Sequence, residues 1–238
     1  LKEFLKELES IPDQLCIDTA TWDGFEKYFD LEVLVQLQTL KMKVEKITDP
    51  DTRSIALILL ASVTVRASKM IRQGDLRFAK ANEKKPDDKN IFANFITKIK
   101  TAIEDIENDA CHPRVETIRL AEDARDIVME NKIDCVITSP PYLNGTNYIR
   151  NTKLELKLTD HIVTEKDLPM FHSKGIIAGI NNVSSRMAPF EVPEIIRPYI
   201  EKLIPVAYDK RIPIMVAGYF HDMKAVIERL SHAMKDSG

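Results

Sequence analysis

A serine, two prolines and a tyrosine stand in a row at Ser139-Pro140-Pro141-Tyr142, and their chemistry suits contact with a planar heterocycle. Each proline fixes φ and lacks an N–H donor, so neighbouring carbonyls stay free to accept hydrogen bonds. The tyrosine offers a flat face for stacking, and the serine hydroxyl both donates and accepts. This tetrapeptide therefore predicts binding of an exocyclic amine, such as that of a nucleobase taken out of its helix.

The elements around the tetrapeptide predict a parallel α/β sheet. The apolar run 134–137, with Cys135 as a small buried residue, indicates a buried strand, 124–130 a short helix, and the alternating segment 115–120 another strand. Strand, helix and strand form the unit of a parallel sheet, and its binding sites lie beyond the carboxyl ends of the strands. The tetrapeptide and Asp123 both follow such an end.

The segment from Asp134 to Tyr142, continued by Leu143-Asn144-Gly145, resembles the catalytic segment of DNA amino-methyltransferases. These enzymes transfer a methyl group from S-adenosylmethionine to cytosine N4 or adenine N6. Their tetrapeptide begins with Ser, Asp or Asn, and serine is more typical of the cytosine-N4 enzymes. The resemblance implies a site-specific DNA methyltransferase acting on a flipped base, with cytosine N4 favoured over adenine N6. The alternative is a proline-stiffened turn closed by a packed tyrosine.

The resemblance also assigns roles to individual residues. Ser139 and the carbonyl of Pro140 would accept hydrogen bonds from the target amine, Pro141 would complete the rigid ledge, and Tyr142 would stack on the base. Direct in-line transfer needs no metal, and positioning would supply much of the rate. For Ser139 the alternative is a turn cap.

Asp123 and Thr138 are the candidates for contact with S-adenosylmethionine. Asp123 ends the first predicted strand, where it would meet the cofactor's adenine or a nearby polar group. The alternative for Asp123 is a helix cap, because Ala124 opens a predicted helix. Thr138 directly precedes the tetrapeptide.

The candidates for DNA contact are Arg66, Lys69, Asn144, Arg150 and Arg186. The net charge is −3, so any attraction to phosphates must come from local clusters of lysine and arginine. The alternatives are charges that complement a helix C-terminus for Arg66 and Lys69, an exposed helix face for Arg150 and a surface loop for Arg186.

The fold class expected for the whole chain is α/β, a partial Rossmann-like methyltransferase core with a large helical insertion. Residues 1–110 would form the insertion and 111–238 the catalytic core. The helical periodicity that supports this division covers 1–8, 31–47, 52–72, 91–106, 147–159, 193–207 and 219–234, while 74–90 and 174–192 are predicted loops.

The chain departs from the family in one respect. Relatives carry a glycine-rich turn that cradles the cofactor, and this chain has seven glycines without such a cluster. Both ends look cut, so three explanations stay open: a fragment that lacks the turn, a second polypeptide that supplies it, or lost cofactor binding.

The expected partners are therefore double-stranded DNA, a second polypeptide or segment with that turn, and a cognate restriction endonuclease. The rival functions are a split or non-catalytic DNA-binding subunit and an RNA or protein amino-methyltransferase.

Composition limits the setting of the protein. With 44% hydrophobic and 30% charged residues in 238, the chain is an ordinary globular one. Three cysteines without paired spacing predict neither a disulfide framework nor a zinc knuckle, and the five histidines have no metal-binding spacing. The longest apolar run, 55–65, is too short to span a bilayer. We therefore expect a cytoplasmic protein.

Overall fold

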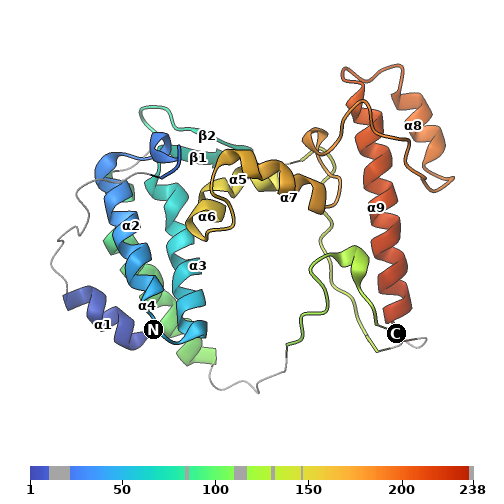
Figure 1. Cartoon of the computed structure of the whole chain (residues 1–238). Helices are drawn as coiled ribbons and strands as arrows, with labels where there is room; N and C mark the ends of the chain where they lie inside the picture. The colour runs from blue at the N-terminus through green and yellow to red at the C-terminus, as the bar shows by residue number, and fades with distance from the viewer. Residues whose placement is uncertain (11–21, 84–85, 110–116, 130–131, 146, 236–238) are drawn as a thin grey trace. The chain divides into compact units, whose positions relative to one another are not determined.

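The computed structural model describes residues 1–10, 22–83, 86–109, 117–129, 132–145 and 147–235 (Figure 1). The chain divides into two compact units, which we call the helical unit and the motif unit. The helical unit comprises Leu1–Val115 and Tyr148–Leu168, and the motif unit comprises Glu116–Asn147 and Pro169–Gly238. Residues 148–168 thus belong with the helical segment, whereas the predicted division ran at 110 and 111.

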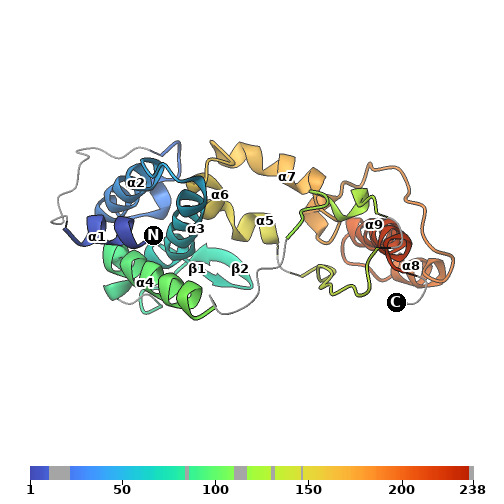
Figure 2. The same cartoon turned by 90° about the horizontal axis from the view of Figure 1, so that it is seen from below.

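Four helices form the body of the helical unit: α1 (Lys2–Ser10), α2 (Leu31–Glu45), α3 (Pro50–Ala67) and α4 (Ile91–Asp109). The three longer ones pack together, with α3 against both α2 and α4, while α1 lies on α4 (Figures 1 and 2). A proline at the first position starts α3, and the Asp49 carboxylate before it accepts the Thr52 N–H at 2.8 Å. The apolar periodicity predicted all four helices, because a buried stripe stabilises each one.

A β-hairpin follows α3, where the sequence predicted helix up to residue 72 and then a loop. Strands β1 (Met70–Gln73) and β2 (Asp75–Phe78) pair antiparallel, and Gly74 joins them at a φ of 75°. Such a φ is open to glycine at little steric cost. The Ser68 hydroxyl accepts the Met70 N–H at 3.0 Å, which turns the chain out of the helix. The prediction was wrong here because the hairpin depends on a turn and on packing beyond the local periodicity.

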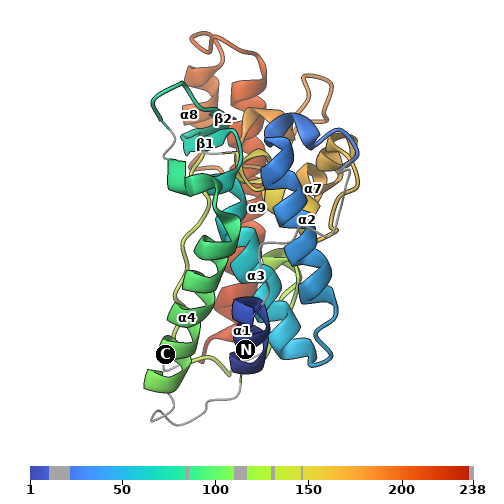
Figure 3. The ribbon, with the colours of Figure 1, turned by 90° about the vertical axis from the view of Figure 1, so that its left-hand side faces the viewer.

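Residues 148–168 complete the helical unit, through α5 (Tyr148–Asn151) and α6 (Lys153–Leu158). Leu154 and Leu158 are fully buried, and α6 packs against α3, the helix that lies between α2 and α4 in Figure 3. Lys157 is also buried, and its ammonium group donates to the Asp23 carboxylate at 2.6 Å and to the Val163 carbonyl at 2.8 Å. The single helix predicted over 147–159 is therefore two short helices that dock by burial.

The longest element of the motif unit is α9 (Arg211–Ala233). It packs against α8 (Arg197–Leu203) and against two 3₁₀ turns, Ala124–Asp126 and Ile180–Asn182. Helix α7 (Leu168–Lys174) precedes the second turn. The predicted helices at 193–207 and 219–234 thus exist with different bounds, while the helix predicted over 124–130 is a single 3₁₀ turn within its described residues.

The two predicted strands of the motif unit are not strands in this structure. In the described part of the chain, residues 117–120 and 134–137 belong to no strand, and residues 115–116 lie outside that part. Cys135 and Ile137 are exposed, the latter at 95%, so the prediction of a buried strand there is wrong. A strand forms only where a neighbour satisfies its main chain and covers its apolar side. The Rossmann-like core itself stays a prediction.

Within the described ranges, none of the helices has the length and apolarity needed to cross a bilayer.

Candidate functional site

The predicted base-binding tetrapeptide lies at the surface of the motif unit. Ser139 and Pro140 are exposed, Pro141 is half-buried, and Tyr142 is 75% exposed. The tyrosine ring is therefore accessible rather than packed into the protein, as a base-stacking role requires. The alternative of a turn closed by a packed tyrosine does not describe this ring.

A tight turn follows the tetrapeptide and sets the direction of Tyr142. The Gly145 N–H donates to the Tyr142 carbonyl at 3.1 Å, and Asn144 has a φ of 54°. Asparagine tolerates this left-handed conformation better than most residues. A Cβ on Gly145 would lie 2.9 Å from the Tyr142 Cβ and 3.1 Å from its carbonyl oxygen. Glycine is therefore required for the turn to close under the tyrosine.

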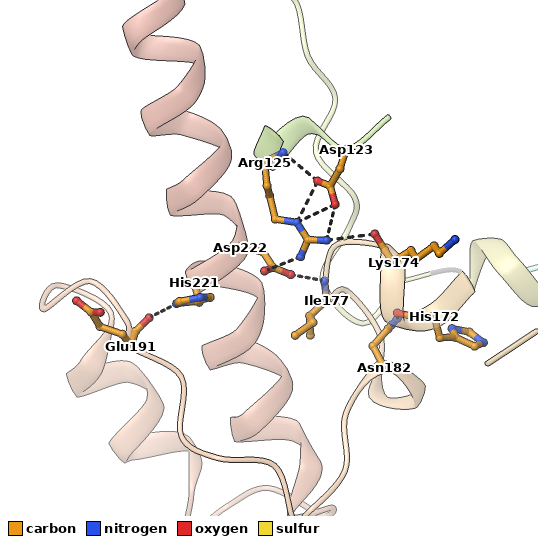
Figure 4. Close-up of polar contacts among 9 residues, drawn as sticks. All are labelled: Asp123, Arg125, His172, Lys174, Ile177, Asn182, Glu191, His221 and Asp222. Atoms are coloured by element: carbon orange, nitrogen blue, oxygen red, sulfur yellow. Dashed lines mark hydrogen bonds and ion pairs between the residues drawn. The ribbon is translucent and has the colours of Figure 1, made fainter. Parts of the chain in front are cut away.

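A main-chain hydrogen bond connects this turn to the segment between α7 and the 3₁₀ turn Ile180–Asn182. The Asn144 N–H donates to the Ala178 carbonyl at 2.6 Å. Next to it, the Ile177 N–H donates to the Asp222 carboxylate of α9 at 2.9 Å (Figure 4). The Asn182 side chain accepts the Gly179 N–H and donates to the His172 carbonyl, each at 3.0 Å. The loop that carries Tyr142 is thus connected to the long helix through two successive residues.

Arg125 joins the same helix to the other end of the predicted strand–helix–strand region (Figure 4). Its guanidinium donates to Asp222 Oδ1 at 2.9 Å, to Asp123 Oδ2 at 2.6 Å and to the Lys174 carbonyl at 3.1 Å. Asp222 is 5% exposed. A buried carboxylate is stable only when it is well paired, and here Arg125 and the Ile177 N–H provide the pairing.

The charges of this cluster shift each other's pKa values. Hydrogen bonding to Arg125 lowers the pKa of Asp123, although partial burial opposes the shift. Hydrogen bonding to Asp123, and then to Asp222, raises the pKa of Arg125 against the effect of burial. Asp123 and Arg125 therefore both carry their charges at neutral pH, and they form an ion pair rather than a proton-transfer group.

Asp123 makes the contacts of a helix cap, which was the alternative interpretation from sequence. Its carboxylate accepts the Arg125 main-chain N–H at 2.9 Å and also bonds the Arg125 side chain. A contact from Asp123 to a cofactor would have to be shared with that guanidinium. Thr138 is exposed beside the tetrapeptide.

The candidates for DNA contact are divided between the units. Arg66, Lys69 and Arg150 belong to the helical unit, whereas Asn144 and Arg186 belong to the motif unit. Arg66 pairs with Asp88, and Lys69 Nζ lies 3.4 Å from Asp30 Oδ1. Arg186 is exposed, as is Arg150 on α5. Two of these cations therefore already have carboxylate partners, which weakens their availability for phosphate.

Sequence reasoning missed a polar cluster around Tyr28 in the helical unit. Lys153 Nζ lies 4.1 Å from the centre of the Tyr28 ring and 2.5 Å from its hydroxyl, which donates to Glu165. Burial raises the pKa of Tyr28 and lowers that of Lys153. Burial opposes the shift at Glu165, but hydrogen bonds from Tyr28 and Lys153 lower its pKa. Tyr28 and Lys153 are 125 residues apart in the sequence, so no local sequence pattern could predict this cluster.

The motif unit also has an apolar groove of about 330 Å³ between α8, α9 and residues 187–192. Its lining includes Phe190, Ile200 and Ile214, and none of the tetrapeptide. Among the described residues, no group of histidine, cysteine or acidic side chains could hold a metal ion. The groove is therefore separate from the loop that the sequence singled out.

No protein-family model, curated protein or solved structure matches this chain.

Proposed function

We propose that this chain carries the base-binding loop of an S-adenosylmethionine-dependent DNA amino-methyltransferase, with cytosine N4 favoured over adenine N6. The observation that carries the proposal is the exposed Tyr142 ring, preceded by Ser139 and two prolines and fixed by the turn at Gly145. An accessible ring on a stiff ledge can stack on an extruded base.

The residues of the loop have separate roles in holding the base. Tyr142 stacks on its face, while the Ser139 hydroxyl and the Pro140 carbonyl accept hydrogen bonds from the exocyclic amine. These bonds orient the amine so that its nitrogen lone pair points away from the ledge. Orientation of this kind lowers the entropic part of a transfer barrier.

The residues at hand do not fit the methyl donor as well as they fit the base. The chain has no glycine-rich cluster, and the carboxylate of Asp123 is engaged by Arg125. We therefore place the donor site on a polypeptide segment other than the described residues. This favours, as a second candidate, a split subunit that holds DNA while another chain binds S-adenosylmethionine.

Binding of a fluorescent base tests the stacking role directly. A short single strand containing 2-aminopurine should bind with quenched fluorescence, because stacking on an aromatic ring quenches this base. Loss of a stacked ring costs about 1–3 kcal/mol, so Tyr142→Ala should weaken binding about 5- to 150-fold and Tyr142→Phe should retain it. Tyr208→Ala is the matched control, since Tyr208 is an exposed tyrosine of the motif unit outside the loop. Equal binding by wild type and Tyr142→Ala would remove the assignment.

Two further measurements separate the candidate functions. Calorimetry with S-adenosylmethionine should show no heat with this chain alone if the donor site lies elsewhere, and heat if the chain is self-contained. Transfer of a labelled methyl group, with the missing segment or second polypeptide added, should favour duplex DNA over RNA and protein and should require Ser139. Incorporation into RNA or protein instead would favour those rival methyltransferases. A cognate restriction endonuclease stays an expectation from the resemblance.

A further inference from the structure

The apolar groove of the motif unit has the size and the lining of a small-molecule site. Its volume of about 330 Å³, between α8, α9 and residues 187–192, lies at the lower end of the roughly 300–1,000 Å³ typical of ligand pockets. Helix α9 contributes Ile214 and Ala217 to its lining, and α8 contributes Ile200. A groove with such walls favours a small ligand with an apolar body.

The wall formed by residues 187–192 is held against α9 by close contacts. Phe190 packs on Gly218 of α9, where an added Cβ would lie 3.0 Å from the phenyl ring. The rings of Phe190 and His221 are 5.7 Å apart, and His221 Nδ1 donates to the Glu191 carbonyl at 2.8 Å (Figure 4). The groove therefore has a third wall that specific contacts hold beside the long helix.

Two side chains of opposite charge lie at this groove. Arg197 and Glu201 both line it, and because they are four residues apart they share one face of α8. Both are exposed, and neither side chain forms a hydrogen bond or an ion pair with the residues that the structure describes. Their order, with the cation before the anion, is the less favourable one for pairing along a helix. A guanidinium and a carboxylate therefore stand ready for a ligand beside an apolar surface.

We propose that this groove binds a free α-amino acid with an apolar side chain. The side chain of the amino acid packs on Ile200 and Ile214. The Arg197 guanidinium donates to the ligand's carboxylate, and the Glu201 carboxylate accepts from its ammonium group. A simple carboxylic acid fits less well, because its negative charge is repelled by Glu201. The groove contains no residue of the tetrapeptide, so this inference goes beyond the proposed function.

Titration of the full chain with L-phenylalanine, followed by the amide NMR signals of the protein, tests the groove. We expect saturable shifts in α8, α9 and residues 187–192, with a dissociation constant of about 1 mM, which is reasonable for so small a ligand. Two analogues each lack one charge: 3-phenylpropionate has no ammonium group, and 2-phenylethylamine has no carboxylate. Each should bind about tenfold more weakly, because one charged group of the protein loses its partner.

Substitutions of the two charged residues locate the contact. Arg197→Gln and Glu201→Gln should each weaken L-phenylalanine binding about tenfold. Both positions are exposed, so both variants should fold as the wild type does. Lys202→Gln is the matched control and should bind as the wild type does, because Lys202 is an exposed cation of the same helix outside the lining of the groove.

Three results would overturn the proposal. They are the absence of saturable shifts up to about 10 mM L-phenylalanine, equal binding of either analogue, and wild-type affinity in Arg197→Gln or Glu201→Gln. The titration uses neither a nucleic acid nor a methyl donor, so its outcome is independent of the test of the proposed function.

Discussion

At the residue scale, one buried carboxylate connects the main parts of the motif unit. Asp222 accepts hydrogen bonds from Arg125 and from the Ile177 N–H, and the next residue, Ala178, accepts the N–H of Asn144. A side chain on α9 is therefore linked to the loop of Tyr142. The tetrapeptide supplies the predicted chemistry, but these bonds determine where it sits within its unit.

Removal of the Asp222 carboxylate should destabilise the motif unit. Hydrogen bonds to a charged group contribute about 1.5–3 kcal/mol, so we expect Asp222→Ala to lower the free energy of unfolding by about that amount. Urea unfolding, followed by circular dichroism rather than by tryptophan fluorescence, measures the change. Asp126→Ala is the matched control, because Asp126 is an exposed aspartate of the same unit and should change stability by less than about 0.5 kcal/mol. Equal losses in both variants would contradict the connecting role of Asp222.

The lowered pKa of Asp123 predicts a dependence of stability on pH. Its pKa in the folded protein lies below that of the unfolded chain, which is about 3.9. The stabilisation is therefore complete above the unfolded pKa and is lost as the pH falls through the folded pKa. We expect the motif unit to lose stability below about pH 4, and Asp123→Asn to flatten this decline. Unfolding curves measured between neutral and acidic pH check it, and an unchanged slope in Asp123→Asn would contradict it.

At the scale of elements, the turn from Tyr142 to Gly145 is the part most sensitive to a single methyl group. It must close tightly because the Gly145 Cα approaches the Tyr142 side chain and carbonyl. It must also present Asn144 to Ala178 with a left-handed φ. The close approach at Gly145 and the left-handed φ of Asn144 together determine the orientation of the Tyr142 ring.

Gly145→Ala should therefore impair base binding more than folding. The added Cβ would force the turn open and move the Tyr142 ring, and a displacement of about 1 Å at a site can cost about 100-fold. We expect 2-aminopurine binding to fall at least about tenfold, with a loss of stability of about 1 kcal/mol. Gly175→Ala is the control, since its Cβ would meet its nearest atom, the Phe171 carbonyl oxygen, at an ordinary 3.7 Å. Wild-type binding by Gly145→Ala would show that the turn does not orient the ring.

At the scale of the whole molecule, the chain leaves the helical unit before the tetrapeptide and returns to it directly afterwards. The return segment is held by Lys157, bonded to Asp23 and Val163, and by Lys153 at Tyr28. Asp222 has its described partners within the motif unit. Each unit thus has its own buried charged residue held by an ion pair: Lys157 with Asp23 in the helical unit, and Asp222 with Arg125 in the motif unit.

This arrangement predicts that substitutions of Lys157 and of Asp222 change the free energy of unfolding independently of each other. Lys157→Ala should speed amide exchange in α3 and α6, while Asp222→Ala should speed it in α9. The losses of stability in the double variant should equal the sum of the single losses within about 0.5 kcal/mol, as holds for sites without shared partners. A coupling larger than about 1 kcal/mol would mean that the two units unfold as one.

The amino-acid sequence by itself determined the longer helices of the helical unit and the chemistry of the loop. The periodicity of α2, α3 and α4 predicts them because helical hydrogen bonds are local and a buried stripe repeats along the chain. The types in Ser139-Pro140-Pro141-Tyr142 likewise predict a stiff, stacking surface without reference to anything distant.

Only the tertiary structure decided the β-hairpin, the absence of strands at 117–120 and 134–137 of the described chain, and the ion pairs and hydrogen bonds that hold each unit together. Arg125 and Asp222 are 97 residues apart, and Tyr28 and Lys153 are 125 apart, so no local pattern pairs them. The segment 134–137 has the composition of a buried strand, yet its main chain is open in the described part of the protein. Strand formation and buried ion pairing both depend on a partner elsewhere in the chain, whereas a helix supplies its own main-chain partners.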